Sequence, residues 1–170
     1  MTARYLKAFG GPVELVVASP LERAVESAEI IRAHVGPVDS RLDERLIEAG
    51  SWRDGLPRAW RPLEYARRYI ERRAHEKVET PEAIARRMLE AVLDARAAIG
   101  DEGSAILVSH QQPIGWAKVA LQRGLPAFRT LAAQGLSPWI YVRGGCELAS
   151  VTTFVFEGPS PRPQIRYFSP

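Results

Sequence analysis

Two short apolar segments, each followed at once by a helical pattern, most constrain what this sequence can fold into. Residues 13–18 and residues 104–108 have the length and composition of buried β-strands. Behind each segment, apolar residues recur at the three- and four-residue spacing of an amphipathic helix. Apolar strands that alternate with helices are typical of an α/β fold with a mostly parallel sheet. We predict that the strand before His110 is buried on both faces.

The other expected elements complete a single α/β domain over residues 1–170. Ser19-Pro20 and Thr80-Pro81 both have the pattern of a helix start, with an N-capping hydroxyl followed by proline at the first helical position. We find no internal repeat and no domain linker. The expected helices run from these starts to about 33 and 98, with another at 63–77; the expected strands are 38–42, 147–156 and 164–168, and residues 43–62 are expected to form loops.

Composition narrows the class of protein. The chain of 170 residues has a formal net charge of +3, with arginine far more frequent than lysine. This suits a small anionic substrate rather than nucleic acid. The single cysteine excludes an internal disulfide and a cysteine-rich zinc site. No apolar run approaches the roughly 20 residues of a membrane span, and the first residues contain no signal-peptide core. We therefore expect a cytoplasmic protein without a membrane partner.

Two strand-to-helix junctions carry the residues that could do chemistry. Arg23 lies in the first turn of the helix that follows residues 13–18, and His110 directly follows residues 104–108. If these strands are neighbours in one parallel sheet, both side chains emerge at the same rim. A guanidinium, an imidazole and two helix N-termini together form a phosphate site. The alternatives are a surface arginine and a structural core histidine.

Three blocks in the same order resemble the histidine phosphatase (phosphoglycerate mutase-like) superfamily. They are residues 19–24 (Ser-Pro-Leu-Glu-Arg-Ala), residues 45–48 (Arg-Leu-Ile-Glu) and residues 108–110 (Val-Ser-His). With the strands and helices around them, the resemblance extends over residues 13–156. It implies the family's three-layer fold, a mostly parallel sheet flanked by helices. It implies phosphomonoester hydrolysis, or phosphoryl transfer between hydroxyls, through a phosphohistidine. No metal and no cofactor are implied.

The resemblance also implies a role for each matching residue. Arg23 and His110 would bind the transferring phosphoryl group, and Gln111 would contact the phosphate as the next residue. The sequence Gln-Gln-Pro at 111–113 stands where the family usually has glycines. Glu48 would be the general acid that protonates the leaving oxygen, and Glu44 is a nearby competitor for that role. The partner implied is a phosphorylated small molecule or inorganic phosphate.

One block of the family has no match in this sequence. The family's nucleophile is a histidine in an Arg-His-Gly block at the end of the first strand, and His34 and His75 do not match it by motif. A central strand beside the one that precedes His110 is therefore expected to be missing, with the domain incomplete at its N-terminus. Three explanations stay open: a misplaced start or shortened chain, a natural remnant that binds anions without turnover, or another segment or chain that fills the slot.

Two classes of function therefore compete. One is a phosphatase-family enzyme whose 170 residues are inactive or impaired, because the covalent nucleophile is absent. The other is a non-catalytic module that binds phosphate or other anions, or a partner. A third interpretation is an unrelated doubly wound fold in which Arg23 and His110 lie far apart. The segment from Trp52 to Lys77 is expected to cover the pocket, and its arginines are compatible with an acidic substrate.

Overall fold

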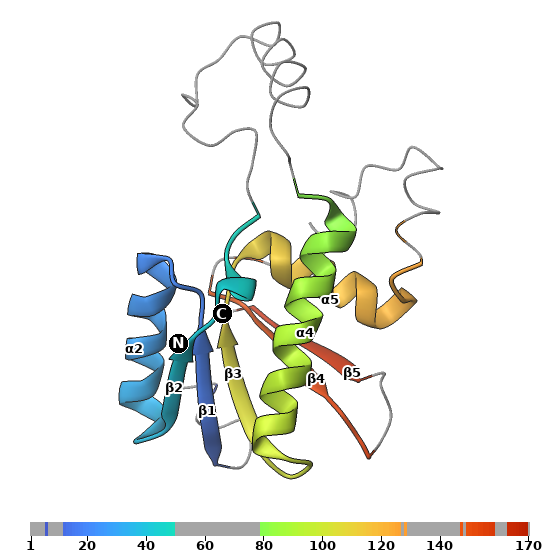
Figure 1. Cartoon of the computed structure of the whole chain (residues 1–170). Helices are drawn as coiled ribbons and strands as arrows, with labels where there is room; N and C mark the ends of the chain where they lie inside the picture. Colours follow the sequence, from blue (N-terminus) through green and yellow to red (C-terminus); the bar gives the residue numbers. More distant parts are fainter. Residues whose placement is uncertain are drawn as a thin grey trace, which may run out of the picture.

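The computed structural model describes residues 6, 12–49, 79–126, 128, 147, 149–158 and 163–169. The expected helix at 63–77 and the expected cover at 52–77 lie outside these residues. Helices and strands alternate along the chain, as the sequence predicts (Figure 1). The elements are β1 (Val13–Ala18), α2 (Glu22–Val35), β2 (Asp39–Leu42), the 3₁₀ turn η1 (Glu44–Leu46), α4 (Pro81–Ile99), β3 (Ser104–Val108), α5 (Gln111–Arg123), β4 (Val151–Val155) and β5 (Gln164–Phe168).

The first three strands form a parallel sheet in the order β2-β1-β3. At its carboxyl edge Ala18 of β1 lies opposite Leu42 of β2 and Val108 of β3. The two apolar strands are thus neighbours in one parallel sheet, which is the condition for Arg23 and His110 to emerge at the same rim. The chain leaves β1 for β2 on one side and later returns to β3 on the other side. Crevices at such a reversal of strand order are where open α/β sheets bind ligands.

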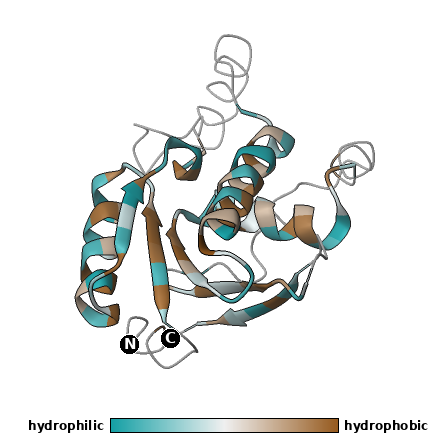
Figure 2. Cartoon of the chain, turned by 60° about the horizontal axis from the view of Figure 1, so that its bottom comes forward, coloured by the Kyte–Doolittle hydropathy of each residue, from teal (hydrophilic) through white to brown (hydrophobic). Residues whose placement is uncertain are grey.

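Strand β1 is the centre of a three-layer core. Leu15 and Val17 pack in one cluster with residues of α4 and α5, whereas Val16 and Ala18 pack in another with Ala28 of α2. Successive side chains of a strand point to opposite faces, so this alternation places α2 on one face and α4 with α5 on the other. Figure 2 shows the corresponding hydropathy, with helices that alternate between hydrophobic and hydrophilic stretches around a hydrophobic middle strand.

Of the two predicted helix starts, one is confirmed and the other is wrong. Thr80 caps α4, its Oγ1 accepting a hydrogen bond from the Ala83 amide at 3.2 Å, and Pro81 is the first helical residue. The start predicted at Ser19-Pro20 is wrong, because Leu21 is the N-cap of α2. The Ser19 hydroxyl is engaged elsewhere, as described below, and its contact with the Leu21 amide is long, at 3.4 Å. Helices α2 and α4 end at glycines with positive φ, 106° and 70°.

Loss of the α4 cap gives a measurable change in stability. Thr80→Ala leaves an amide of the first turn without its side-chain acceptor, and we expect the free energy of unfolding to fall by about 1 kcal/mol. Thr80→Ser keeps the accepting oxygen and is the matched control, expected to stay close to the unchanged protein. Urea denaturation of the three proteins compares them. Equal losses for the two variants would contradict the capping role.

Strand β3 is an edge strand within the described part of the chain. It pairs with β1 alone, and β4 and β5 form a separate antiparallel ladder. All five residues of β3 are half-buried, so the prediction of a strand fully buried on both faces is wrong. A strand with one hydrogen-bonded neighbour receives less cover than a central one.

The predicted C-terminal strands are confirmed, β4 in a shorter form than expected. It covers residues 151–155 of the expected 147–156, and it pairs with β5 in a register that places Val151 opposite Phe168. In the described ranges, no helix is both long enough and apolar enough to span a membrane.

Candidate functional site

The carboxyl ends of β1 and β3 bring the two predicted junctions together. Because Ala18 and Val108 are opposite each other, the residues that follow them meet directly, and the Ser19 amide donates to the Val108 carbonyl at 2.9 Å. From this point one chain segment enters α2 and the other enters α5. The site therefore lies at the strand-order reversal, with two helix N-termini beside it.

A buried hydrogen bond joins the two junctions. His110 Nε2 and Ser19 Oγ are 2.8 Å apart, and the tautomer of the ring decides which of them donates. Ser19 is completely buried and His110 is 7% exposed. His110 is also the N-cap of α5, and its carbonyl accepts from the Ile114 amide at 3.1 Å. Both the backbone and the ring of His110 are thus fixed in place.

The surroundings of His110 keep its ring uncharged at neutral pH. Burial, followed by the positive charges of Arg23 and Arg87, lowers the pKa of His110 to about 4. Arg23 lies on α2 and Arg87 on α4, so cationic side chains approach the ring from both helical layers. An anion placed among these groups would offset the repulsion, because it favours the charged imidazole.

Arg23 is the second residue of α2 and is exposed. The first backbone N–H groups of an α-helix have no partner within the helix, and the helix dipole favours negative charge there. Gln111 is also exposed and opens α5 beside His110. The structure thus brings Arg23, His110 and Gln111, the residues expected to contact phosphate, to one rim of the sheet.

Glu48 comes to the same region by way of the turn η1. It follows this turn by two residues and is half-buried, and its Oε1 accepts from the Ala49 amide at 3.0 Å. The Ser109 hydroxyl donates to the Leu46 carbonyl at 2.8 Å, which ties the turn to the junction that carries His110. Glu44, the competing acid, is exposed.

A network of ion pairs also holds the turn η1 against α4. Asp43 caps the turn, accepting from the Arg45 amide at 2.9 Å, and its carboxylate also contacts the Arg45 guanidinium at 2.7 Å. This contact keeps the pKa of Asp43 below its usual value. Arg45 reaches across to Asp94 of α4, also at 2.7 Å. The turn that precedes Glu48 is therefore fixed to α4.

Two residues of the site were not predicted in their roles. The sequence pattern predicts a helix cap at Ser19, but the Ser19 hydroxyl binds the His110 ring. Arg87 is absent from the predicted site residues, yet it lies near His110 and contacts η1. A signal for Arg87 exists, because residues 84, 88 and 91 are buried and position 87 falls in the same helical stripe. A charged residue within an apolar stripe indicates a buried partner.

The remaining histidines lie elsewhere or outside the described residues. His34 is exposed in the last turn of α2, where its Nδ1 lies 2.8 Å from the Ile30 carbonyl oxygen. His75 is outside the described residues. Across the described ranges, no three His, Cys, Asp or Glu side chains group closely enough to hold a metal ion.

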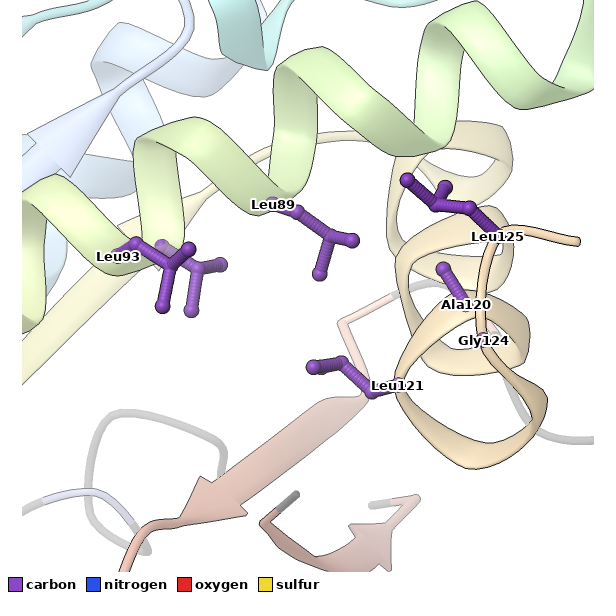
Figure 3. Close-up of a pocket in the computed structure, with 7 residues that line it drawn as sticks. Leu89, Leu93, Ala120, Leu121, Gly124 and Leu125 are labelled. Carbon is purple, nitrogen blue, oxygen red and sulfur yellow. The ribbon is translucent and has the colours of Figure 1, made fainter. Parts of the chain in front are cut away.

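A hollow lies between α4 and α5, and His110 is not among the residues that line it (Figure 3). It has a volume of about 300 Å³ and is lined by apolar residues, among them Leu89 and Leu121. None of its lining side chains can titrate or act as a nucleophile, so it offers no group for catalysis.

Comparisons with known proteins point to the same family that the sequence motifs resemble. A model of the histidine phosphatase superfamily (branch 1) matches residues 2–161. The solved structure of mycobacterial hydrolase 1 is similar to this chain with a TM-score of 0.59 and 18% identity, over 98% of this chain and 78% of that one. A phosphoglycerate mutase from Plasmodium falciparum gives a TM-score of 0.40 and 18% identity, over 98% and 88%. No curated protein sequence matches the chain.

Proposed function

Since the chain belongs to the histidine phosphatase superfamily, a family of phosphatase and mutase type, we propose that it binds the phosphoryl group of a phosphorylated small molecule at the carboxyl ends of β1 and β3. The observation that carries this proposal is the buried Ser19–His110 pair with the Arg23 guanidinium close enough to affect the ring. A buried histidine whose pKa is depressed by neighbouring cations is suited to an anionic ligand.

In this proposal three side chains bind the phosphoryl oxygens. Arg23 supplies a fixed positive charge and paired N–H donors, and His110 supplies a ring N–H from a rigid backbone. Gln111 adds a neutral donor at the start of α5. Phosphoryl transfer depends mainly on positioning and on stabilisation of charge, which these groups provide without a metal. Binding of a dianion would raise the pKa of His110 and draw a proton onto the ring.

Glu48 is the proposed general acid. A carboxylic acid at the edge of the pocket can give its proton to the leaving oxygen as the bond to phosphorus breaks. The half-buried placement of Glu48, directly after the segment that Ser109 ties to the His110 junction, supports this choice over the exposed Glu44.

The nucleophile determines how much turnover to expect. Formation of a phosphohistidine requires a histidine that attacks the phosphorus, and His110 is committed here to binding the phosphoryl group. Neither of the other histidines lies in an Arg-His-Gly block. We therefore propose that the 170-residue chain binds phosphate well but hydrolyses phosphomonoesters weakly or not at all. This makes a non-catalytic anion-binding module the second candidate function.

Calorimetry and an activity assay together test the proposal. We expect inorganic phosphate and orthovanadate to bind the 170-residue chain, and p-nitrophenyl phosphate to be hydrolysed slowly or not at all. The same assay on a form extended upstream by its own coding sequence separates an impaired enzyme from a binding module. In whichever form turns over, Glu48→Gln should lower the rate and Glu44→Gln should not. Absence of anion binding contradicts the site, and rapid turnover through a phosphorylated residue other than histidine contradicts the nucleophile argument.

A further inference from the structure

Arg87 uses its guanidinium as a clamp between two parts of the chain. Its Nη1 donates to the carbonyls of Arg45 and Ile47, at 2.5 and 2.8 Å. Its Nε and Nη2 donate to the two carboxylate oxygens of Glu79, at 2.8 and 3.0 Å. The Arg87 side chain is 16% exposed. A planar fork of donors can meet such a set of acceptors, whereas the single ammonium of lysine cannot.

The clamped carbonyls lie just before Glu48. The Arg45 and Ile47 carbonyls accept hydrogen bonds from Arg87, and the Leu46 carbonyl between them accepts one from the Ser109 hydroxyl. Three consecutive carbonyls are therefore held by side chains, from α4 on one side and from the β3–α5 junction on the other. The backbone that delivers Glu48 is fixed relative to His110, which follows Ser109 directly.

The same guanidinium joins two points that are distant in sequence. The first point is the buried Ala49, which follows Glu48, and the second is Glu79, immediately before the cap of α4. Arg87 contacts the turn before the first point and the carboxylate at the second. One side chain thus links the turn that precedes Glu48 to the residue before the α4 cap.

We propose that Arg87 is a positioning residue for the acid: it fixes the turn that carries Glu48 against the His110 junction, and Glu79 fixes Arg87 in turn. The proposal rests on the proposed function for the role of Glu48, but the clamp itself can be tested without any ligand. The competing interpretation is that Arg87 contributes only to global stability.

The charge of Arg87 supplies a second, independent readout. Among the described residues, the charged groups that act on the His110 ring are Arg23 from α2 and Arg87 from α4, and the ring's partner Ser19, which follows β1, is neutral. Removing the charge of Arg87 while keeping a polar side chain should therefore move the titration midpoint of His110 upward. Keeping the charge but losing the fork should leave that midpoint nearly unchanged.

Amide hydrogen exchange measures the clamp directly. The amides of Leu46 and Ile47 donate within the turn, to Asp43 and Glu44 at 3.1 and 3.2 Å. We expect Arg87→Lys to accelerate their exchange by about tenfold or more, beyond any general change, because bonds to a charged donor are lost. Glu79→Gln should accelerate the same amides to a smaller extent. The matched control is Arg86→Lys, since Arg86 is the exposed neighbour on α4, paired with Glu82.

The outcomes separate this inference from the proposed function. Selective acceleration at the turn, with an upward shift of the His110 midpoint in Arg87→Gln by NMR, supports positioning. Exchange that is unchanged in Arg87→Lys and Glu79→Gln, or raised equally along α4 and the turn, overturns it. Should Arg87→Gln fail to fold, the two exchange experiments still decide. Loss of phosphate binding in Arg23→Ala with a normal clamp would leave both proposals standing, whereas no phosphate binding in the unchanged chain refutes the proposed function alone.

Discussion

Arg23→Ala is expected to weaken the binding of inorganic phosphate by roughly 10- to 150-fold. A charged hydrogen-bond donor contributes about 1.5 to 3 kcal/mol, and each 1.4 kcal/mol is about a factor of ten in affinity. Arg23 is exposed, so its removal costs no packing and the fold should be retained. The dissociation constant from calorimetry at low ionic strength is the quantity to compare.

The control for this variant lies on the same helix. Arg32→Ala removes an exposed arginine from the last turn of α2, far along the helix from the site. It changes net charge equally, so it reports any long-range effect of charge. Similar losses of affinity in the two variants would mean that phosphate responds to net charge and not to a site at Arg23.

His110 is expected to make the protein less stable as the pH falls from 6.5 towards 4. The unfolded ring titrates near 6.5 and the folded ring near 4, so between these values the unfolded state binds a proton that the folded state does not. Acid therefore favours unfolding in this window, and above it the contribution is constant. The full window corresponds to roughly 3 kcal/mol, and about 2 kcal/mol of this falls between pH 7.5 and pH 5.

Replacement of the ring isolates this contribution. In His110→Gln the difference in urea-unfolding free energy between those two pH values should shrink by about 2 kcal/mol. His34→Gln, which changes an exposed histidine on α2, is the matched control. The Asp43 carboxylate, which pairs with Arg45, becomes protonated only at lower pH, because its pKa lies below the usual value. An unchanged pH dependence in His110→Gln would contradict the buried, uncharged ring.

Local sequence patterns were sufficient for most elements of the fold. Strand β1 alternates between two apolar clusters, and α4 begins at the predicted Thr80-Pro81 cap. Such features depend on neighbouring residues, so they can be read from spacing alone. The degree of burial of β3 could not be predicted in the same way, because it depends on how many strands pair with it.

The residues of the candidate site could likewise be predicted only in part. The meeting of Arg23 and His110 followed from strand adjacency, and the approach of Glu48 followed from a family resemblance. The Ser19 side chain shows where local reasoning fails. Ser19 lies in a helix-capping motif, yet its hydroxyl forms a hydrogen bond with a buried ring nitrogen 91 positions away. A buried imidazole without a partner would cost more free energy than a lost cap, so the distant contact prevails.

The distance in sequence between Ser19 and His110 has a consequence for the behaviour of the protein in phosphate buffer. Closing a loop of 91 positions happens only when the sheet has assembled, so the unfolded ensemble lacks the proposed anion site. By mass action, free phosphate would then shift the equilibrium towards the native state, by about 2.7 kcal/mol at a hundredfold excess over its dissociation constant. The choice of buffer anion would thus act as a thermodynamic variable for this molecule, and phosphate would protect it against heat.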